Sequence, residues 1–209
     1  MPNSASHLHE QFNKAAVRDL IRQRRHAIPT TQQITDANAL VAQWQRLSDV
    51  LEVNKIALYL SQDGELNLAP LIESLWASNK QLFLPVLRPL APNRLWFAPY
   101  HKSSQLVKNK YNIDEPDCLP NQFIAPSKLD IIICPLVGFD QSGGRLGMGG
   151  GFYDRTLQYL LTYDTRPRFV GVAYQQQRVD KIPMERWDIR LDAVLTPENC
   201  YWSAQPNSG

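Results

Sequence analysis

Six of the ten glycines in this 209-residue chain fall within one short stretch, residues 143–151. The stretch follows an apolar run at 131–134 and precedes a helical pattern at 153–161. We therefore expect a strand, a glycine loop and a helix in succession, an arrangement that presents backbone N–H groups to a phosphate. Glycine permits both positive φ and close approach of the backbone to a ligand. A tight connection that needs glycine for its geometry alone is the alternative.

Two charged residues add chemistry to this loop. Arg145 carries a planar guanidinium that matches phosphate oxygens, and as a loop residue we expect it to be solvated. Asp154 places a carboxylate where Mg²⁺ could bridge to phosphates, although an acid in the first turn of a helix is also favoured without a metal. The loop is not a P-loop, because no Gly-Lys-Ser/Thr follows. It is not a dinucleotide fingerprint either, because Phe152 replaces the third glycine.

Apolar runs alternate with segments of helical periodicity along the chain, which predicts the fold class. Helices are expected over 6–26, 31–47 and 67–79, the last with Asn67 as its N-cap. Strands are expected over 56–60, 81–86, 95–98, 131–134, 169–173 and 193–195. This order predicts an α/β fold: a single three-layer α/β/α domain with a largely parallel central sheet, Rossmann-like, that binds ligands at the carboxyl ends of its strands. We expect an irregular excursion over 88–128 and frayed tails at 1–5 and 203–209.

Composition excludes several classes of protein. A net charge of +2 argues against binding polyanions by bulk electrostatics. The sequence has neither an apolar run long enough to span a bilayer nor a secretory signal. Three widely spaced cysteines suggest reduced thiols in the cytoplasm. The four histidines fall outside every motif, so neither a zinc site nor a histidine-based triad can be assembled.

The first expected helix carries a basic stripe. Lys14, Arg18, Arg22 and Arg25 are spaced by four, four and three residues, which places them on one face, nearly opposite the apolar face. Three interpretations remain open for this stripe: a solvated basic face, a nucleic-acid-binding surface, or a set of cations over a bound nucleotide.

Two further sites are ambiguous from the residues alone. Residues 62–67 lie just past an expected strand, and they form either a surface turn around Asp63-Gly64 or a set of polar groups that face a ligand. Asp192 lies in an apolar strand, where a bare carboxylate is costly. Arg190 and Arg186 are candidate ion-pair partners for it.

Residues 145–154 resemble the signature of the 5-formyltetrahydrofolate cyclo-ligase family, whose members are also called methenyltetrahydrofolate synthetases. That signature reads Arg-Leu-Gly-x-Gly-x-Gly, then Phe or Tyr, then Tyr-Asp. Four other segments resemble family segments in the same order, namely 14–18, 59–67, 135–140 and 190–194. The resemblance extends from about residue 14 to residue 197, which is nearly the whole chain.

The resemblance implies an ATP- and Mg²⁺-dependent ligase that converts 5-formyltetrahydrofolate to 5,10-methenyltetrahydrofolate, releasing ADP and phosphate. It implies that Arg145 and Tyr153 act in catalysis and that Asp154 and Asp192 bind Mg²⁺. The residues that it assigns to ATP are Lys14, Arg18, Arg145, Leu146, Gly147, Met148, Gly149, Gly150, Gly151, Phe152 and Tyr153. Those that it assigns to the folate are Gln62, Glu65 and Asn67.

The chain departs from the family pattern in two places. Family members commonly carry an acid at the position of Asn67, and some carry Lys or Arg at Met148 or Gly150. We therefore expect Lys14, Arg18 and Arg145 to balance the phosphate charge. We expect a cytoplasmic monomer that acts on small molecules, without nucleic-acid or membrane partners. Two alternatives stay open: a diverged ATP-binding member with another substrate, and a non-catalytic module that binds nucleotide or nucleic acid.

Overall fold

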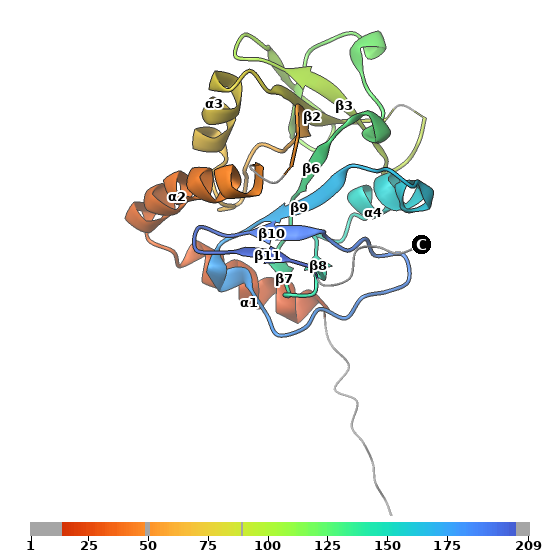
Figure 1. Cartoon of the computed structure of the whole chain (residues 1–209). Helices are drawn as coiled ribbons and strands as arrows, with labels where there is room; N and C mark the ends of the chain where they lie inside the picture. Colours follow the sequence, from red (N-terminus) through yellow and green to blue (C-terminus); the bar gives the residue numbers. More distant parts are fainter. Residues whose placement is uncertain (1–13, 49–50, 89, 204–209) are drawn as a thin grey trace, which may run out of the picture.

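A central sheet of seven strands organises the computed structural model, which describes residues 14–48, 51–88 and 90–203 (Figure 1). Its strand order is β11-β10-β9-β6-β1-β2-β3. The strands are β1 (Lys55–Ala57), β2 (Gln81–Leu87), β3 (Leu95–Tyr100), β6 (Ile131–Cys134), β9 (Arg168–Val172), β10 (Ala193–Leu195) and β11 (Cys200–Trp202). The five inner strands are parallel, and β11 and β3 pair antiparallel at the two edges. The largely parallel sheet is confirmed.

Helices cover both faces of the sheet. Helices α2 (Thr30–Ser48) and α3 (Ala69–Ala77) lie on one side, and α4 (Phe152–Leu157) lies on the other (Figure 1). Strand β6 contributes to both cores, since Ile131 and Ile133 face α2 and α3 while Ile132 and Cys134 pack with α4. This alternation of buried side chains is expected for a strand covered on both faces. The expected α/β/α layers are therefore present.

Most expected elements occur within a few residues of their predicted bounds. Strand β1 is shorter than expected, and β11 was not expected. Helix α3 begins at Ala69 with Leu68 as its N-cap, so the prediction that Asn67 is the N-cap is wrong by one position. Instead, Asn67 Oδ1 accepts a hydrogen bond of 2.9 Å from the Ala69 N–H.

The expected excursion at 88–128 is more regular than predicted. It includes the antiparallel hairpin β4 (Leu106–Lys108) and β5 (Asp114–Pro116), and the 3-10 turns Pro120–Gln122 and Pro126–Lys128. The tails expected to fray, apart from residue 203, and the expected helical residues 6–13 lie outside the described residues.

We had predicted that the glycine stretch follows the central strand directly, and this is wrong. A hairpin of β7 (Gly138–Phe139) and β8 (Arg145–Leu146) comes between β6 and the loop. Asp140 Oδ1 accepts from the Gly144 N–H at 3.0 Å, which places the first two glycines in the hairpin turn. The loop proper is therefore 147–151. It contains Gly149 at φ +97° and Gly151 at φ +64°, and glycine adopts such left-handed conformations without a steric penalty.

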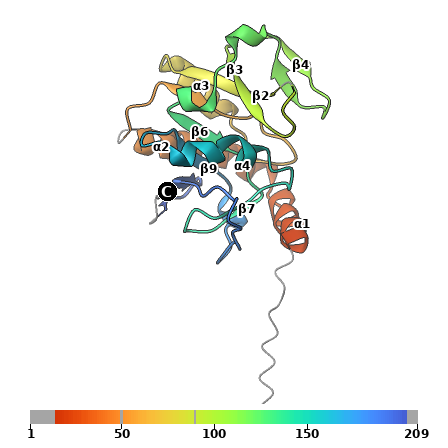
Figure 2. The same cartoon turned by 90° about the vertical axis from the view of Figure 1, so that its right-hand side faces the viewer.

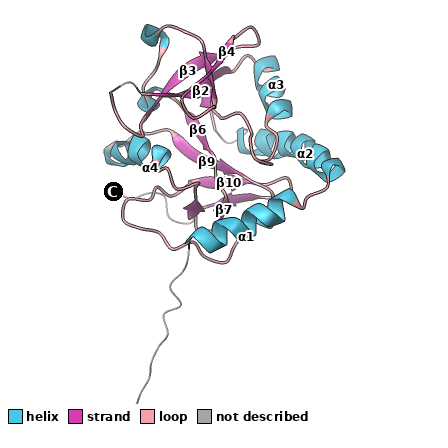
Figure 3. Cartoon of the chain, turned by 180° about the vertical axis from the view of Figure 1, so that it is seen from behind, coloured by secondary structure: helices cyan, strands magenta, loops and turns pink. Residues whose placement is uncertain are grey.

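Helix α1 (Lys14–His26) lies across one end of the molecule, close to β7 (Figures 2 and 3). It buries Ile21 and Arg25, whereas Leu20 is 48% exposed. The helix therefore turns part of its basic stripe toward the protein. Of the three interpretations of that stripe, a fully solvated face is wrong.

Candidate functional site

A cavity of about 930 Å³ opens at the carboxyl ends of the central strands. Tyr59 follows β1, Pro135 follows β6 and Leu87 ends β2, and all three line the cavity. Helix α1 and the loop at 147–151 form further parts of the wall. The cavity therefore lies where a parallel α/β sheet is expected to bind its ligand.

Fourteen of the sixteen predicted site residues line this cavity. They are Lys14, Arg18, Gln62, Glu65, Arg145, Leu146, Gly147, Met148, Gly149, Gly150, Gly151, Phe152, Tyr153 and Asp154. The cavity lining does not include Asn67 or Asp192. The structure thus brings together segments that lie more than a hundred residues apart in the chain, such as Lys14 and Gly147.

The first half of α1 contacts the glycine loop. Arg18 Nε donates to the Gly147 carbonyl oxygen at 2.7 Å. A Cβ atom built on Gly149 would lie 3.7 Å from Arg18 Nη2, so the guanidinium lies directly against the loop backbone. Lys14 Nζ pairs with Asp188 Oδ2 at 3.3 Å, on the same side of the cavity. Among the described residues, Arg18 donates to this neutral carbonyl and forms no ion pair, so its positive charge is not compensated there.

Arg145 is buried, which corrects the expectation that it is solvated. Its side chain is 5% exposed, and its Nη2 donates to Asp154 Oδ1. The same carboxylate oxygen accepts from the Ile189 N–H at 3.0 Å. Arg145 Nε is buried and has no partner among the described residues. The guanidinium and the carboxylate therefore neutralise each other at the cavity wall.

Another part of the wall holds neutral phenols and a half-buried acid. Burial raises the pKa of Glu65, and the Gln62 N–H, which donates to Glu65 Oε2 at 3.1 Å, opposes that shift. Burial and the nearby Glu65 raise the pKa of Tyr59, while burial followed by Cys134 raises that of Tyr153. Both phenols are therefore neutral hydrogen-bonding groups. This wall can bind a flat polar ligand through a carboxylate and two hydroxyl groups.

The thiol nearest the site is chemically inert. All three cysteines are free, as the sequence predicts. Cys134 is fully buried beneath the cavity, and burial raises its pKa to about 12. Since the thiolate is the reactive form of cysteine, Cys134 is not suited to act as a nucleophile at neutral pH.

Asp192 lies away from the cavity lining, in a buried ion pair. Arg166 donates to both of its carboxylate oxygens, at 2.7 and 2.8 Å, and the Phe169 N–H donates to Oδ2 at 2.7 Å. The expected ion pair is therefore present, but its partner is Arg166 and not Arg190 or Arg186. Asp192 could reach a metal only if Arg166 released it.

The donor set of the cavity fits Mg²⁺ in one mode. Within the described ranges, no group of three or more His, Cys, Asp or Glu side chains could hold a metal by itself. Asp154 contributes one carboxylate, and its contacts with Arg145 and Ile189 both use Oδ1. Mg²⁺ commonly binds through one or two carboxylates together with waters and substrate phosphates. Asp154 fits that mode, in which the phosphates supply most of the ligands.

Several cavity residues were not predicted from the sequence. They include Arg25, Tyr59, Asp63, Tyr111, Trp187 and Asp188. Arg25 continues the basic stripe of α1, and Asp63-Gly64 is a turn sequence, so both belonged to visible patterns. Tyr59 begins the segment 59–67 that resembles the family, whereas Tyr111, Trp187 and Asp188 carried no local signal. Only the fold brings them to the cavity.

A glycine loop and cations at the carboxyl edge of a parallel sheet are typical of α/β enzymes that bind phosphorylated ligands. The model of the 5-formyltetrahydrofolate cyclo-ligase family matches residues 10–197. The chain is 45% identical to the 5-formyltetrahydrofolate cyclo-ligase of Escherichia coli, an alignment that covers 87% of this chain and 99% of the relative. It is 40% identical to the 5-formyltetrahydrofolate cyclo-ligase of Haemophilus influenzae, an alignment that covers 86% of this chain and 95% of the relative.

A solved structure shows the same fold. The NMR structure of Aquifex aeolicus 5,10-methenyltetrahydrofolate synthetase superposes with a TM-score of 0.76 at 27% identity, covering 92% of this chain and 94% of that one. The chain therefore belongs to the 5-formyltetrahydrofolate cyclo-ligase family, a family of ligases. No helix in the described part of the chain is both long and apolar enough to cross a membrane.

Proposed function

We propose that this protein is an ATP- and Mg²⁺-dependent ligase that converts 5-formyltetrahydrofolate to 5,10-methenyltetrahydrofolate, with release of ADP and phosphate. The observation that carries the proposal is the contact between the cationic face of α1 and the glycine loop, at the edge of a cavity of about 930 Å³. The relatives carry the corresponding name. The enzyme is proposed to act as a cytoplasmic monomer, without nucleic-acid or membrane partners.

ATP is assigned to the glycine-loop side of the cavity. The backbone N–H groups of 147–151 and the Arg18 guanidinium, whose charge its carbonyl partner does not compensate, suit the triphosphate. Lys14 and Arg145 line the same edge and offer further hydrogen-bond donors, although each is paired with an aspartate. Asp154 would hold Mg²⁺, which would offset the negative charge of the phosphates. Asp192 stays a prediction as a second metal contact.

The folate is assigned to the wall that carries Tyr59, Gln62 and Glu65. A pterin ring presents amino and ring N–H donors, and a carboxylate supplies matching acceptors. Tyr153 follows the loop immediately in the sequence and lines the cavity. It would position the transferred phosphate or the folate. A role for Asn67 in substrate binding stays a prediction.

The proposed reaction has two steps. The formyl oxygen attacks the γ-phosphorus of ATP, the bond to the β-phosphate oxygen breaks, and ADP leaves. The N10 amine then attacks the activated formyl carbon and loses its proton, and the C–O bond breaks with release of inorganic phosphate. An amide oxygen is a poor leaving group, which explains the use of ATP. The protein contributes placement of the two substrates and compensation of phosphate charge.

Absorbance of the methenyl product tests the proposal directly. Purified protein is given 5-formyltetrahydrofolate with ATP and Mg²⁺ together, and then with either one omitted. The proposal predicts product only in the complete mixture, with one ADP formed for each methenyl group. ATP hydrolysis with another amide or folate, but no methenyl product, would instead identify a diverged family member. Nucleotide binding without turnover would identify a binding module.

A further inference from the structure

The turn that carries Glu65 adopts a backbone that needs external support. Asp63 has φ +50° and Gly64 has φ +74°, so two successive residues are left-handed. A residue other than glycine in this region is strained unless its surroundings hold it in place. The turn is closed internally by the Glu65 N–H, which donates to the Gln62 carbonyl at 2.9 Å.

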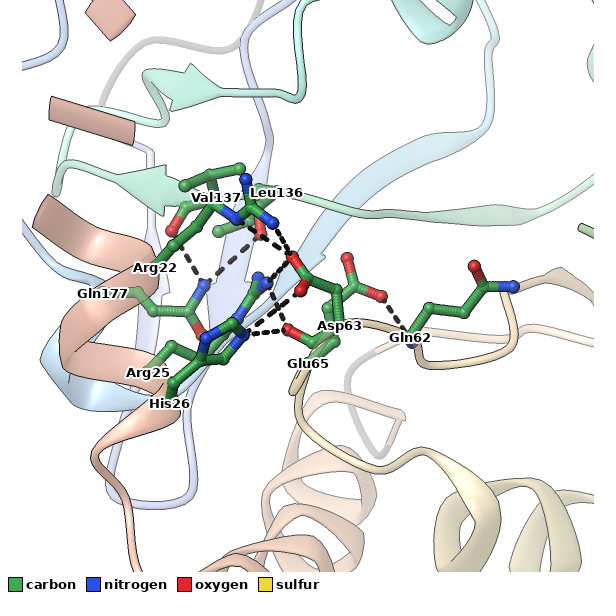
Figure 4. Close-up of polar contacts among 9 residues, drawn as sticks. All are labelled: Arg22, Arg25, His26, Gln62, Asp63, Glu65, Leu136, Val137 and Gln177. Carbon is green, nitrogen blue, oxygen red and sulfur yellow. Dashed lines mark hydrogen bonds and ion pairs between the residues drawn. The ribbon is translucent and has the colours of Figure 1, made fainter. Parts of the chain in front are cut away.

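The support comes from the second half of α1 (Figure 4). Arg25 Nη2 donates to Asp63 Oδ2 at 2.8 Å, and Arg22 Nη2 lies 2.9 Å from the same oxygen. His26 Nε2 lies 3.2 Å from Asp63 Oδ1 and 2.9 Å from the Asp63 carbonyl oxygen. Three side chains from one helix thus converge on one residue that is nearly forty positions away in sequence.

Burial and packing show that this contact is specific. Arg25 is 1% exposed, and its Nε and Nη1 atoms are buried without a partner among the described residues. A buried guanidinium is costly unless it is paired, so its hold on Asp63 is strong. A Cβ atom built on Gly64 would lie 2.8 Å from His26 Cδ2, which shows that the turn is packed closely against the helix.

We propose that Asp63 and Arg25 are positioning residues for the folate side of the cavity. Their ion pair fixes the turn 62–65 on α1 and thereby holds the Glu65 carboxylate toward the substrate. Nothing in this contact involves the phosphates, which the first half of the same helix approaches through Arg18. The inference rests on the proposed function, since it assumes that Glu65 binds the folate.

The test is a comparison of Michaelis constants in Asp63→Asn. Asparagine keeps the size of aspartate and its tolerance of positive φ but removes the charge that Arg25 and Arg22 hold. We expect KM for 5-formyltetrahydrofolate to rise about tenfold, while KM for ATP and kcat stay within about twofold. Asp19→Asn is the matched control, because Asp19 is an exposed carboxylate on α1 that does not line the cavity.

A second variant protects the test against loss of folding. Arg22 is 38% exposed, so Arg22→Gln should fold, and it should raise KM for the folate about threefold. Arg24→Gln, at an exposed position of the same helix, should match wild type. An unchanged folate KM in Asp63→Asn, or an equal rise in both Michaelis constants, would overturn the positioning role.

Hydrogen exchange tests whether the Asp63–Arg25 ion pair holds the turn, and this test does not depend on the proposed function. The amides of 62–66 should exchange faster in Asp63→Asn than in wild type, without any ligand present, while those of 147–151 stay unchanged. If wild type makes no methenyl product, the proposed function fails independently of this result. Unchanged exchange at 62–66 would show that the ion pair does not hold the turn, whatever the substrate.

Discussion

The two halves of α1 each carry an arginine that contacts another segment, but the two arginines have different partners. In the first half, Arg18 donates to the carbonyl of Gly147, at the edge of the cavity. In the second half, Arg25 is buried and donates to the carboxylate of Asp63. A guanidinium on a carbonyl keeps its full charge for an anionic ligand, whereas one on a carboxylate is neutralised and fixes the local structure.

The comparison shows that the role of a cationic side chain depends on its partner. Its residue type and its spacing along the helix do not determine that role. Arg18 and Arg25 belong to one stripe with helical spacing, and the spacing alone does not distinguish them. The same criterion applies to Arg145, which is paired with Asp154 and is therefore neutralised in the protein without ligands. Arg18 is thus the residue best suited to attract the triphosphate.

Gly149→Val should have the largest effect on ligand binding. It should disrupt only the nucleotide side of the cavity, where Arg18 contacts the glycine loop. The position has φ +97°, and a side chain there would lie against the Arg18 guanidinium. A β-branched residue is strained at this φ and blocks approach of a phosphate, so nucleotide affinity should fall more than about a hundredfold, ~2.7 kcal/mol. Calorimetric titration with an ATP analogue measures the loss. Folate binding is the internal control, and unchanged nucleotide affinity would reduce the loop to a simple turn.

Arg145→Ala should reduce both the turnover and the free energy of unfolding. Loss of a solvated arginine would reduce the turnover alone. Loss of a charge-assisted contact to phosphate predicts a ten- to hundredfold fall in turnover, about 1.5–3 kcal/mol. Asp154 would also lose its partner at the buried end of the pair, at a cost of roughly 2 kcal/mol of unfolding free energy. Kinetics and urea unfolding measure the two effects, with Arg24→Ala as the control. Wild-type stability would mean that the buried pair contributes nothing.

The two predicted metal residues should respond differently to removal of charge. In Asp154→Asn the Mg²⁺ concentration for half-maximal rate should rise roughly fivefold, about 1 kcal/mol, because Asp154 lines the cavity. Asp192→Asn should mainly lower the unfolding free energy, since Arg166 and Phe169 occupy its oxygens. A magnesium titration at saturating ATP measures both midpoints. An equal shift in the two variants would return Asp192 to the metal site.

The hairpin before the loop should show the smallest effect, as a dependence of stability on pH. Burial alone would raise the pKa of Asp140, but hydrogen bonds from the Ile182 N–H, the Ser142 hydroxyl and the Gly144 and Ser142 N–H groups lower it below its ordinary value of 3.8. The stability that Asp140 contributes is therefore present above that value and is lost as the pH falls through the lower folded pKa. Asp140→Asn should cost about 1 kcal/mol at pH 7, and the difference from wild type should shrink as the pH falls through the lowered folded pKa. Urea unfolding across this range measures it, and a constant difference would show that the charge is irrelevant.

The sequence predicts the layers and the parallel sheet because buried strands such as 131–134 are continuous apolar runs. The hairpin of β7 and β8 was missed, since its two-residue strands are too short to show periodicity. The glycine loop and its flanking charges were found from the sequence because they are local. Tyr111 and Trp187 could not be found in this way, since nothing but the tertiary fold places them at the cavity.

The burial of charged groups was the least predictable property of the site. Arg145 lies in a polar loop sequence that suggests exposure, yet it packs into the protein beside Asp154. Asp192 pairs with Arg166, a residue that no local pattern connects to it. An ion pair forms between residues that the fold brings together, so its partners cannot be read from sequence neighbours.

Equilibrium binding of each ligand alone tests the central claim, that one cavity holds ATP on the Arg18 side and folate on the Glu65 side. An ATP analogue with Mg²⁺ and 5-formyltetrahydrofolate are titrated separately into wild type, Arg18→Ala, Glu65→Gln and the control Arg24→Ala. We predict that Arg18→Ala weakens only the nucleotide and Glu65→Gln only the folate, each about tenfold, ~1.4 kcal/mol. If both variants weakened the same ligand, or if neither weakened either one, this division of the cavity would be contradicted.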